Sequence, residues 1–156
     1  MRAMRALELK IPPPLLAGLF AAAMYGMAVA LPQWAWPLPM KAWLAGLSMA
    51  AGLSVAALGV LAFRRHRTTV NPLQPQAAVR IVTTGIFAHS RNPMYLGMAL
   101  CLAAWALWLG HLLAWLGVPL FIACLQRLQI QPEERILLRK FGQPYADYLE
   151  QVRRWC

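Results

Sequence analysis

The sequence predicts an all-α, polytopic membrane protein with about four transmembrane helices and a cytoplasmic C-terminal helical cap. Three observations support this fold class. Hydrophobic residues make up 60% of the 156 residues, charged residues make up 13%, and the mean hydropathy is +0.51. The apolar residues form long blocks instead of following a helical or strand period, which is typical of membrane spans. Arginines flank these blocks, as the positive-inside rule requires.

The net charge of +10 arises from 15 Lys and Arg against 5 Asp and Glu. A soluble protein this basic would suggest a nucleic-acid partner. Because the arginines lie next to apolar spans, attraction to an anionic leaflet explains the charge better. We therefore expect membrane lipids as partners and no nucleic acid, in a single domain that covers residues 1–156.

The first span is expected at residues 15–31, directly after the triple proline of residues 12–14. This block is about long enough to cross a bilayer. Ala28-Val29-Ala30 resembles the small-residue site at which a signal peptide is cleaved. We nevertheless expect a retained first span.

The second span is expected at residues 42–63. Trp34 and Trp36 lie in the proline-rich connection before it, which is typical of the aromatic belt at a membrane interface. The basic run 64–67 follows the span and marks its cytoplasmic end. Small residues within the span predict close helix packing; they are Gly46, Gly52 and Gly59.

The third and fourth spans are expected at residues 93–109 and 112–128. Asn92 suits the N-cap of the third span, and Pro93 suits its first position, where the missing N–H has no intrahelical partner. Pro119 is expected to bend the fourth span. Lys and Arg counts by loop place both termini in the cytoplasm, and we expect a prokaryotic inner-membrane location.

The tail, residues 130–156, differs from the rest of the chain. A first tail helix is expected to start at Pro132 and to end at Gly142, and a second one to start at Pro144. The tail contains all the acidic residues except Glu8; they are Glu133, Glu134, Asp147 and Glu150. We expect a folded cap.

The chain has no acidic residue between Leu9 and Pro132. This argues against a proton-coupled multidrug transporter, which needs an ionisable group within its spans. The same absence argues against a carboxylate metal site in the bilayer. No metal site is expected elsewhere either, because the three histidines lack ligand spacing.

Polar residues gather at the predicted start of the third span and in the tail. Each has a simpler explanation: Glu133-Glu134 complements a helix dipole, Tyr95 suits an aromatic belt, and Arg91 follows the positive-inside rule. Together they predict a water-facing pocket for a cationic, partly apolar ligand, with carboxylates and aromatic rings for the positive charge. S-adenosylmethionine has such a mixture of sulfonium, ammonium and carboxylate groups.

Two segments resemble a known family. Residues 84–97, TGIFAHSRNPMYLG, resemble the G-x-Y/F-x-x-x-R-H/N-P-x-Y-x-G segment of isoprenylcysteine carboxyl methyltransferases and the related phospholipid methyltransferases. Residues 133–155 are similar to the second motif of that family. The two motifs occur in the family's order, separated by one helical hairpin.

The resemblance implies an integral-membrane methyltransferase that uses S-adenosylmethionine and acts on a lipophilic small molecule or lipid from the bilayer. Cofactor contacts carried over from the family are His89, Arg91, Asn92, Pro93, Tyr95, Gly97, Glu133 and Glu134. Residues expected on the substrate side are Tyr145, Tyr148 and Arg154.

The methyl acceptor stays open at this point, because the form with Asn92 also occurs among phospholipid methyltransferases. For a carboxylate acceptor, which we favour, no base is needed and Arg154 would orient the carboxylate. For an amine acceptor, Glu134 or Tyr148 would take the proton. A non-catalytic membrane protein of the same fold is the third interpretation.

Overall fold

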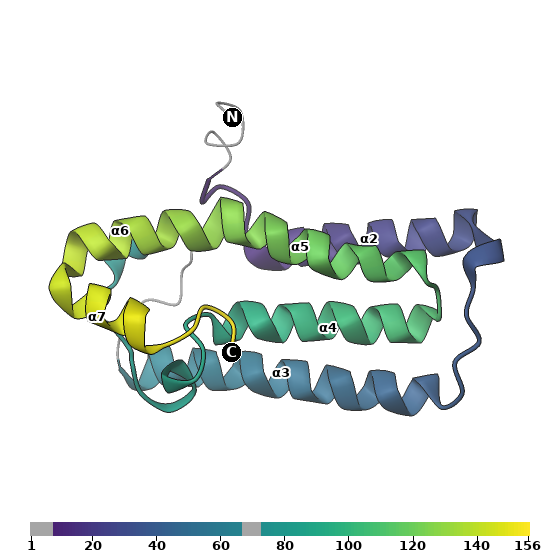
Figure 1. The fold of residues 1–156 in the computed structure, drawn as a ribbon, viewed down its shortest axis with the longest axis horizontal. Helices are drawn as coiled ribbons and strands as arrows, with labels where there is room; N and C mark the ends of the chain where they lie inside the picture. Colours follow the sequence, from purple (N-terminus) through teal and green to yellow (C-terminus); the bar gives the residue numbers. More distant parts are fainter. Residues whose placement is uncertain (1–7, 67–72) are drawn as a thin grey trace.

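The computed structural model describes residues 8–66 and 73–156, and it confirms the all-α fold class. Helices α2 (Pro13–Ala30), α3 (Lys41–Arg65) and α4 (Pro93–Leu109) run alongside a long composite helix that includes α5 (Gly117–Leu125) and α6 (Gln131–Phe141). Figure 1 shows α4 between α3 and the pair formed by α2 and α5. Helix α7 (Gln143–Gln151) folds back across the end of the bundle where α4 begins.

Three helices of the described chain are long and apolar enough to cross a membrane: α2, α3 and the continuous helix Leu113–Phe141. Helix α4 is apolar but has only 17 residues. At about 1.5 Å per residue such a helix reaches about 26 Å, near the thickness of the hydrocarbon layer. The chain is thus an integral membrane protein, and four spans are still the topology we expect.

The fourth helix differs from the prediction, because it does not stop at residue 128. A π-helical turn, Gln126–Ile130, joins α5 directly to α6. Pro132 has no N–H to give to the carbonyl of Leu128, four residues earlier, and its ring would clash with that carbonyl in a regular helix. The extra residue of the π turn relieves this conflict. The N–H of Leu9 donates a hydrogen bond to the Leu128 carbonyl at 2.9 Å, which satisfies that carbonyl.

The bend expected at Pro119 stays a prediction; the structure has a 3-10 segment, Leu113–Leu116, directly before α5. Pro119 cannot donate to the carbonyl of Trp115, so the tighter winding lies in the turn before the proline. The other spans begin within two residues of their predicted starts.

Glycines let α3 and α4 approach closely, as predicted for Gly52 and Gly59. A Cβ added at Gly52 would lie 2.8 Å from the Gly97 carbonyl oxygen, and one added at Gly59 would lie 2.7 Å from Cγ of Met94. The prediction is wrong for Gly46, which faces outward with no atom within 4 Å of such a Cβ. The close contacts at Gly52 and Gly59 hold the start of α4 against α3.

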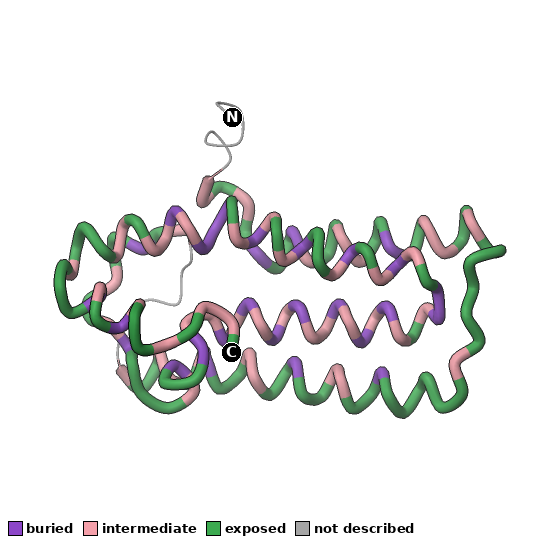
Figure 2. The backbone as a smooth tube through the Cα atoms, in the orientation of Figure 1, coloured by how far each residue is buried: buried purple, intermediate pink, exposed green. Residues whose placement is uncertain are grey.

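Buried residues line the inner faces of the helices, and exposed residues dominate the outer face of α3 (Figure 2). The outer face of α3 carries large apolar side chains such as Trp43 and Leu47, which are 73% and 69% exposed. Such a surface suits a lipid environment. Trp34 and Trp36 are also exposed, at the end of the bundle away from α7.

Candidate functional site

A cavity lies at the end of the bundle where α3 ends and α4 begins. Helices α6 and α7 and the segment 75–82 complete its walls. The empty space amounts to about 830 Å³, part of it open solvent. The described residues that line it are Phe63, Pro75, Ala78, Arg80, Ile81, Val82, Phe87, Arg91, Asn92, Pro93, Met94, Tyr95, Ile130, Glu133, Glu134, Leu137, Phe141, Tyr145 and Tyr148.

Glu133 and Tyr95 meet in this cavity from two different helices. The Tyr95 hydroxyl donates a hydrogen bond to Oε2 of Glu133 at 3.1 Å, and both residues line the cavity. Tyr95 is on the first turn of α4 and is buried, while Glu133 is on the first turn of α6. The acid-bearing tail therefore covers the start of α4, and one cavity connects them.

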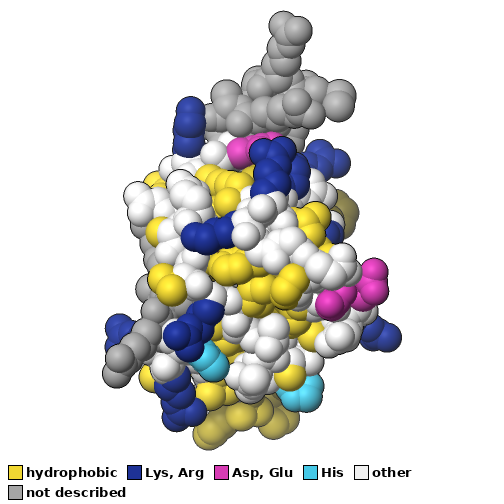
Figure 3. Space-filling model, turned by 90° about the vertical axis from the view of Figure 1, so that its left-hand side faces the viewer, with side chains coloured by type: hydrophobic (Ala, Val, Ile, Leu, Met, Phe, Trp, Pro, Cys, Tyr) yellow, Lys and Arg dark blue, Asp and Glu magenta, His cyan; other side chains and the backbone are white. Residues whose placement is uncertain are grey.

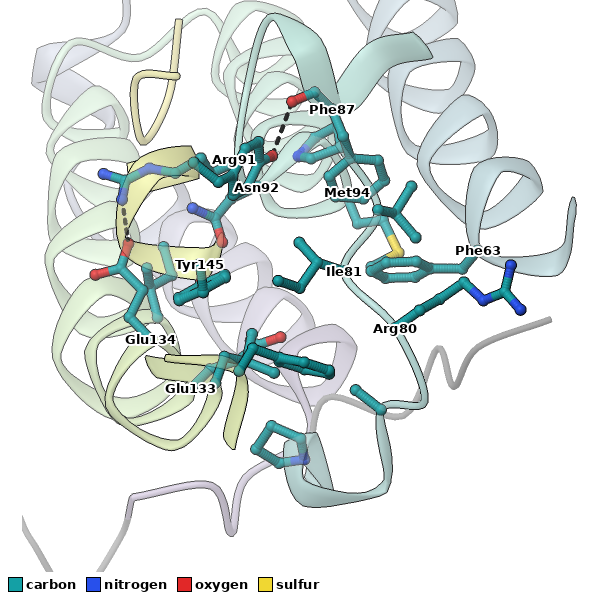
Figure 4. A pocket seen from close by; sticks show the side chains of 18 of the residues that line it. Phe63, Arg80, Ile81, Phe87, Arg91, Asn92, Met94, Glu133, Glu134 and Tyr145 are labelled. Carbon is teal, nitrogen blue, oxygen red and sulfur yellow. Dashed lines mark hydrogen bonds and ion pairs between the residues drawn. The ribbon is translucent and has the colours of Figure 1, made fainter. Parts of the chain in front are cut away.

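Glu134 is held by Arg154 and by Arg91, and Figure 4 shows the contact with Arg91. Arg154 donates from Nε to Oε1 at 3.1 Å and from Nη2 to Oε2 at 2.7 Å. Nη1 of Arg91 lies 3.4 Å from Oε1 of the same carboxylate. The bond to Glu134 raises the pKa of Arg154, so that its guanidinium stays charged. A bidentate pair of this kind fixes direction as well as distance.

The end of the tail is bound to the start of α4 through its backbone. The N–H of Arg91 donates to the Arg153 carbonyl, and Nδ2 of Asn92 donates to the Arg154 carbonyl, both at 3.1 Å. Asn92 occupies the N-cap position of α4, as predicted, but its side chain forms no capping hydrogen bond to the helix. The tail offers it a carbonyl, which the sequence alone does not reveal.

Two tyrosines of α7 also line the cavity. The rings of Tyr145 and Tyr148 lie 6.1 Å apart, and both residues are buried. The Tyr148 hydroxyl donates to the Phe87 carbonyl at 2.8 Å. Burial raises the pKa of both phenols, so they stay protonated at neutral pH. This arrangement does not favour Tyr148 as a base.

We predict that Tyr148→Phe loses about 1–3 kcal/mol of unfolding free energy, because the buried Phe87 carbonyl loses its donor. Activity should keep its dependence on pH between about pH 6 and 9, since the phenol does not ionise there. Thermal unfolding and a pH–rate profile check the two parts. The control is Tyr25→Phe, because Tyr25 is 54% exposed on α2. If Tyr148→Phe alone lost a limb of the pH–rate profile, Tyr148 would be the base after all.

Eight of the eleven predicted site residues line the cavity, and three do not. The eight are Arg91, Asn92, Pro93, Tyr95, Glu133, Glu134, Tyr145 and Tyr148. His89 is exposed and lies outside the cavity lining. Gly97 packs against Gly52 and Ala56 of α3. Arg154 is bonded to Glu134 and does not line the cavity itself.

Sequence reasoning missed the apolar half of the cavity and one of its cations. Phe63 ends the apolar part of α3, and Arg80, Ile81 and Val82 come from the segment before the first motif. The signal for this segment is weak, because residues 77–82 suit a short interfacial helix and an extended segment equally well. In the structure, a bond from Nζ of Lys140 to the Gln76 carbonyl joins the preceding turn to α6.

Fold and cavity together define a helical membrane protein with a charged, aromatic site at one end of its bundle. The family model for phospholipid methyltransferases matches residues 40–144, more than half of the chain. The chain belongs to the phospholipid methyltransferase family. It is therefore a member of a family of membrane methyltransferases.

A protein of Haemophilus influenzae (strain KW20 / Rd), named only "Uncharacterized protein", is 53% identical over 62 residues. The match covers 40% of this chain and 98% of that protein. No solved structure matches the chain.

Proposed function

We propose that the protein transfers a methyl group from S-adenosylmethionine to a lipophilic acceptor that enters from the bilayer. The observation that carries this proposal is the convergence of Glu133, Glu134, Arg91 and Tyr95 in one largely apolar cavity of a methyltransferase-family chain. Such a cavity suits a ligand that is both charged and apolar.

The residues present suit the cofactor. Among the described residues, Glu133 accepts a hydrogen bond from Tyr95 and forms no ion pair, so a sulfonium or ammonium group would supply the cationic partner that it lacks. Nε of Arg91 is buried without a hydrogen-bond partner, so a carboxylate would satisfy it. The ring of Tyr145 adds an aromatic face that attracts a cation.

When bound, S-adenosylmethionine supplies a sulfonium methyl group, which passes to the acceptor while the electron pair of the broken C–S bond stays on sulfur. The protein's part is to hold both reactants in line and to exclude water. The bond from Arg154 to Glu134 and the tail bonds to Arg91 and Asn92 keep the cover of the cavity in place.

A carboxylate is the acceptor we favour, because its methylation releases no proton. Both carboxylate oxygens of Glu134 already face arginines, and the Tyr148 hydroxyl is already a donor. Neither group is therefore set up as a base. Arg154, which we expected to orient the acceptor, is instead bonded to Glu134, so its role is to position that carboxylate.

A phospholipid amine is the second candidate. An amine acceptor must lose a proton, and Glu133 is the carboxylate in the described cavity that no arginine neutralises. The name of the matching family, phospholipid methyltransferase, also favours this acceptor.

We place the cavity on the cytoplasmic side, in a prokaryotic inner membrane. Arg64 and Arg65 end α3 at this level, and the tail contributes further arginines. Lys and Arg side chains surround an apolar centre at this end of the molecule (Figure 3). Both termini would then be cytoplasmic, where the cofactor is available.

The test combines cofactor binding with methyl transfer. Purified protein in detergent should bind S-adenosylmethionine in a calorimeter, and Glu133→Gln should weaken binding at least about tenfold. Gln can still accept the Tyr95 bond, so the variant removes charge alone. Glu150→Gln, on the exposed face of α7, is the control.

Labelled cofactor and a membrane lipid extract then identify the acceptor. Base-labile label released as methanol indicates an ester, and stable label in the head group indicates N-methylation. A folded protein that binds no cofactor would support the non-catalytic interpretation. Cofactor binding without transfer to any extract would contradict the two enzymatic candidates.

A further inference from the structure

The charges of the cavity are divided between its two sides. Glu133 and Glu134 lie on α6, and Arg91 lies beside Glu134 (Figure 4). Arg80 lies across the cavity from Glu134, on the side of Phe63, and its guanidinium extends away from the glutamates (Figure 4). One side therefore attracts a cation, and the other presents a cation of its own.

Arg80 is the lining arginine whose charge is not already matched. Arg91 faces the Glu134 carboxylate at 3.4 Å, whereas no hydrogen bond or ion pair joins the Arg80 side chain to another described residue. Arg80 is also exposed. Its guanidinium is free to bind an anion at the outer edge of the cavity, beside Phe63.

The position of Arg80 along the bundle is that of lipid head groups. It shares the cavity wall with Phe63, the last apolar residue of α3, and Arg64 and Arg65 follow at once. Basic residues directly after a span lie at the level of the anionic head groups. An amphiphile in this leaflet would bring its anionic group to Arg80 without leaving the interface.

The wall between the two charged sides is apolar. Ile81, Val82, Phe87 and Met94 contribute to it, and the rings of Phe63 and Phe87 lie 4.8 Å apart. This surface suits the hydrocarbon part of an acceptor next to its anionic group.

We propose that Arg80 binds the anionic group of the acceptor and thereby determines specificity for anionic amphiphiles. The inference rests on the proposed function, because it assigns the second substrate of the same cavity. In a carboxylate acceptor the bound anion is the group that is methylated. In an amine-bearing phospholipid the bound anion is the phosphate, and the amine extends toward Glu133.

The test measures binding of three compounds to the purified protein in nonionic detergent by calorimetry. Dodecanoate carries a carboxylate, dihexanoyl phosphatidylethanolamine carries a phosphodiester, and dodecanol carries no charge. Arg80→Gln should weaken binding of at least one anionic compound by about tenfold or more, while Arg80→Lys should stay within about threefold of the parent protein. Dodecanol binding should not change. The matched control is Arg64→Gln, because Arg64 is exposed at the end of α3 and does not line the cavity.

The compound that loses affinity identifies the source of the anion. Unchanged binding of both anionic compounds in Arg80→Gln, or no binding of either to the parent protein, overturns the proposal. In the transfer assay, Arg80→Gln should raise the KM for the acceptor and leave cofactor affinity unchanged. Because cofactor affinity is measured separately, failure of the Arg80 assignment is distinguishable from failure of the methyltransferase proposal.

Discussion

Glu134→Gln is expected to lower methyl transfer at least about 100-fold and to weaken cofactor binding at least about tenfold. Glu134 accepts two hydrogen bonds from Arg154 and faces Arg91 at 3.4 Å. The variant leaves two guanidinium groups side by side without their counterion. Hydrogen bonds to charged groups contribute about 1.5–3 kcal/mol each, so the loss is large enough to release the tail from α4.

Release of the tail has a readout that does not depend on activity. Trypsin should cut after Arg153 and Arg154 faster in Glu134→Gln, since these residues are otherwise held by Arg91 and Asn92. Transfer and binding assays complete the measurement, with Glu150→Gln as the control of equal charge change. If proteolysis and cofactor affinity both stay as in the parent protein, Glu134 only complements the dipole of α6.

The sequence predicted the helices well because their signals are local. Block length, prolines at first helical positions and flanking arginines located α2, α3 and α4 to within about two residues. The predicted break between α5 and α6 was wrong; it was expected because Pro132 usually starts or breaks a helix. Its conflict was instead relieved by a π turn whose free carbonyl binds Leu9, a partner more than a hundred residues away in the chain.

The candidate site shows the same division between local and distant information. The motifs predicted which polar residues lie together in the cavity, because Tyr95 and Glu133 each lie in the first turn of a helix at the same end of the bundle. They did not predict that Arg154 binds Glu134, or that Asn92 binds the tail, since both contacts depend on how α7 folds back. The apolar half of the cavity was missed because residues 75–82 carry no periodic pattern.

Substitution of Gly97 by Ala is expected to destabilise the protein by about 1–3 kcal/mol, as overpacking does in a closely packed interface. An added Cβ would lie 2.5 Å from the Gly52 carbonyl oxygen and 2.8 Å from Cβ of Ala56. Neither neighbour can move without shifting a whole helix, because one is backbone and the other is a methyl group fixed to it. Thermal unfolding in detergent, followed by circular dichroism, measures the loss.

Gly46→Ala is the matched control, because an added Cβ there meets no atom within 4 Å. Since Ala favours a helix over Gly by about 1 kcal/mol, this variant should be as stable as the parent protein or slightly more so. Gly52→Ala should resemble Gly97→Ala in stability, because it opens the same contact from the α3 side. The pair also separates packing from cofactor contact at Gly97. If packing is its role, both variants weaken S-adenosylmethionine binding equally, through a displaced α4; a much larger loss in Gly97→Ala alone would mean that the cofactor reaches Gly97 itself.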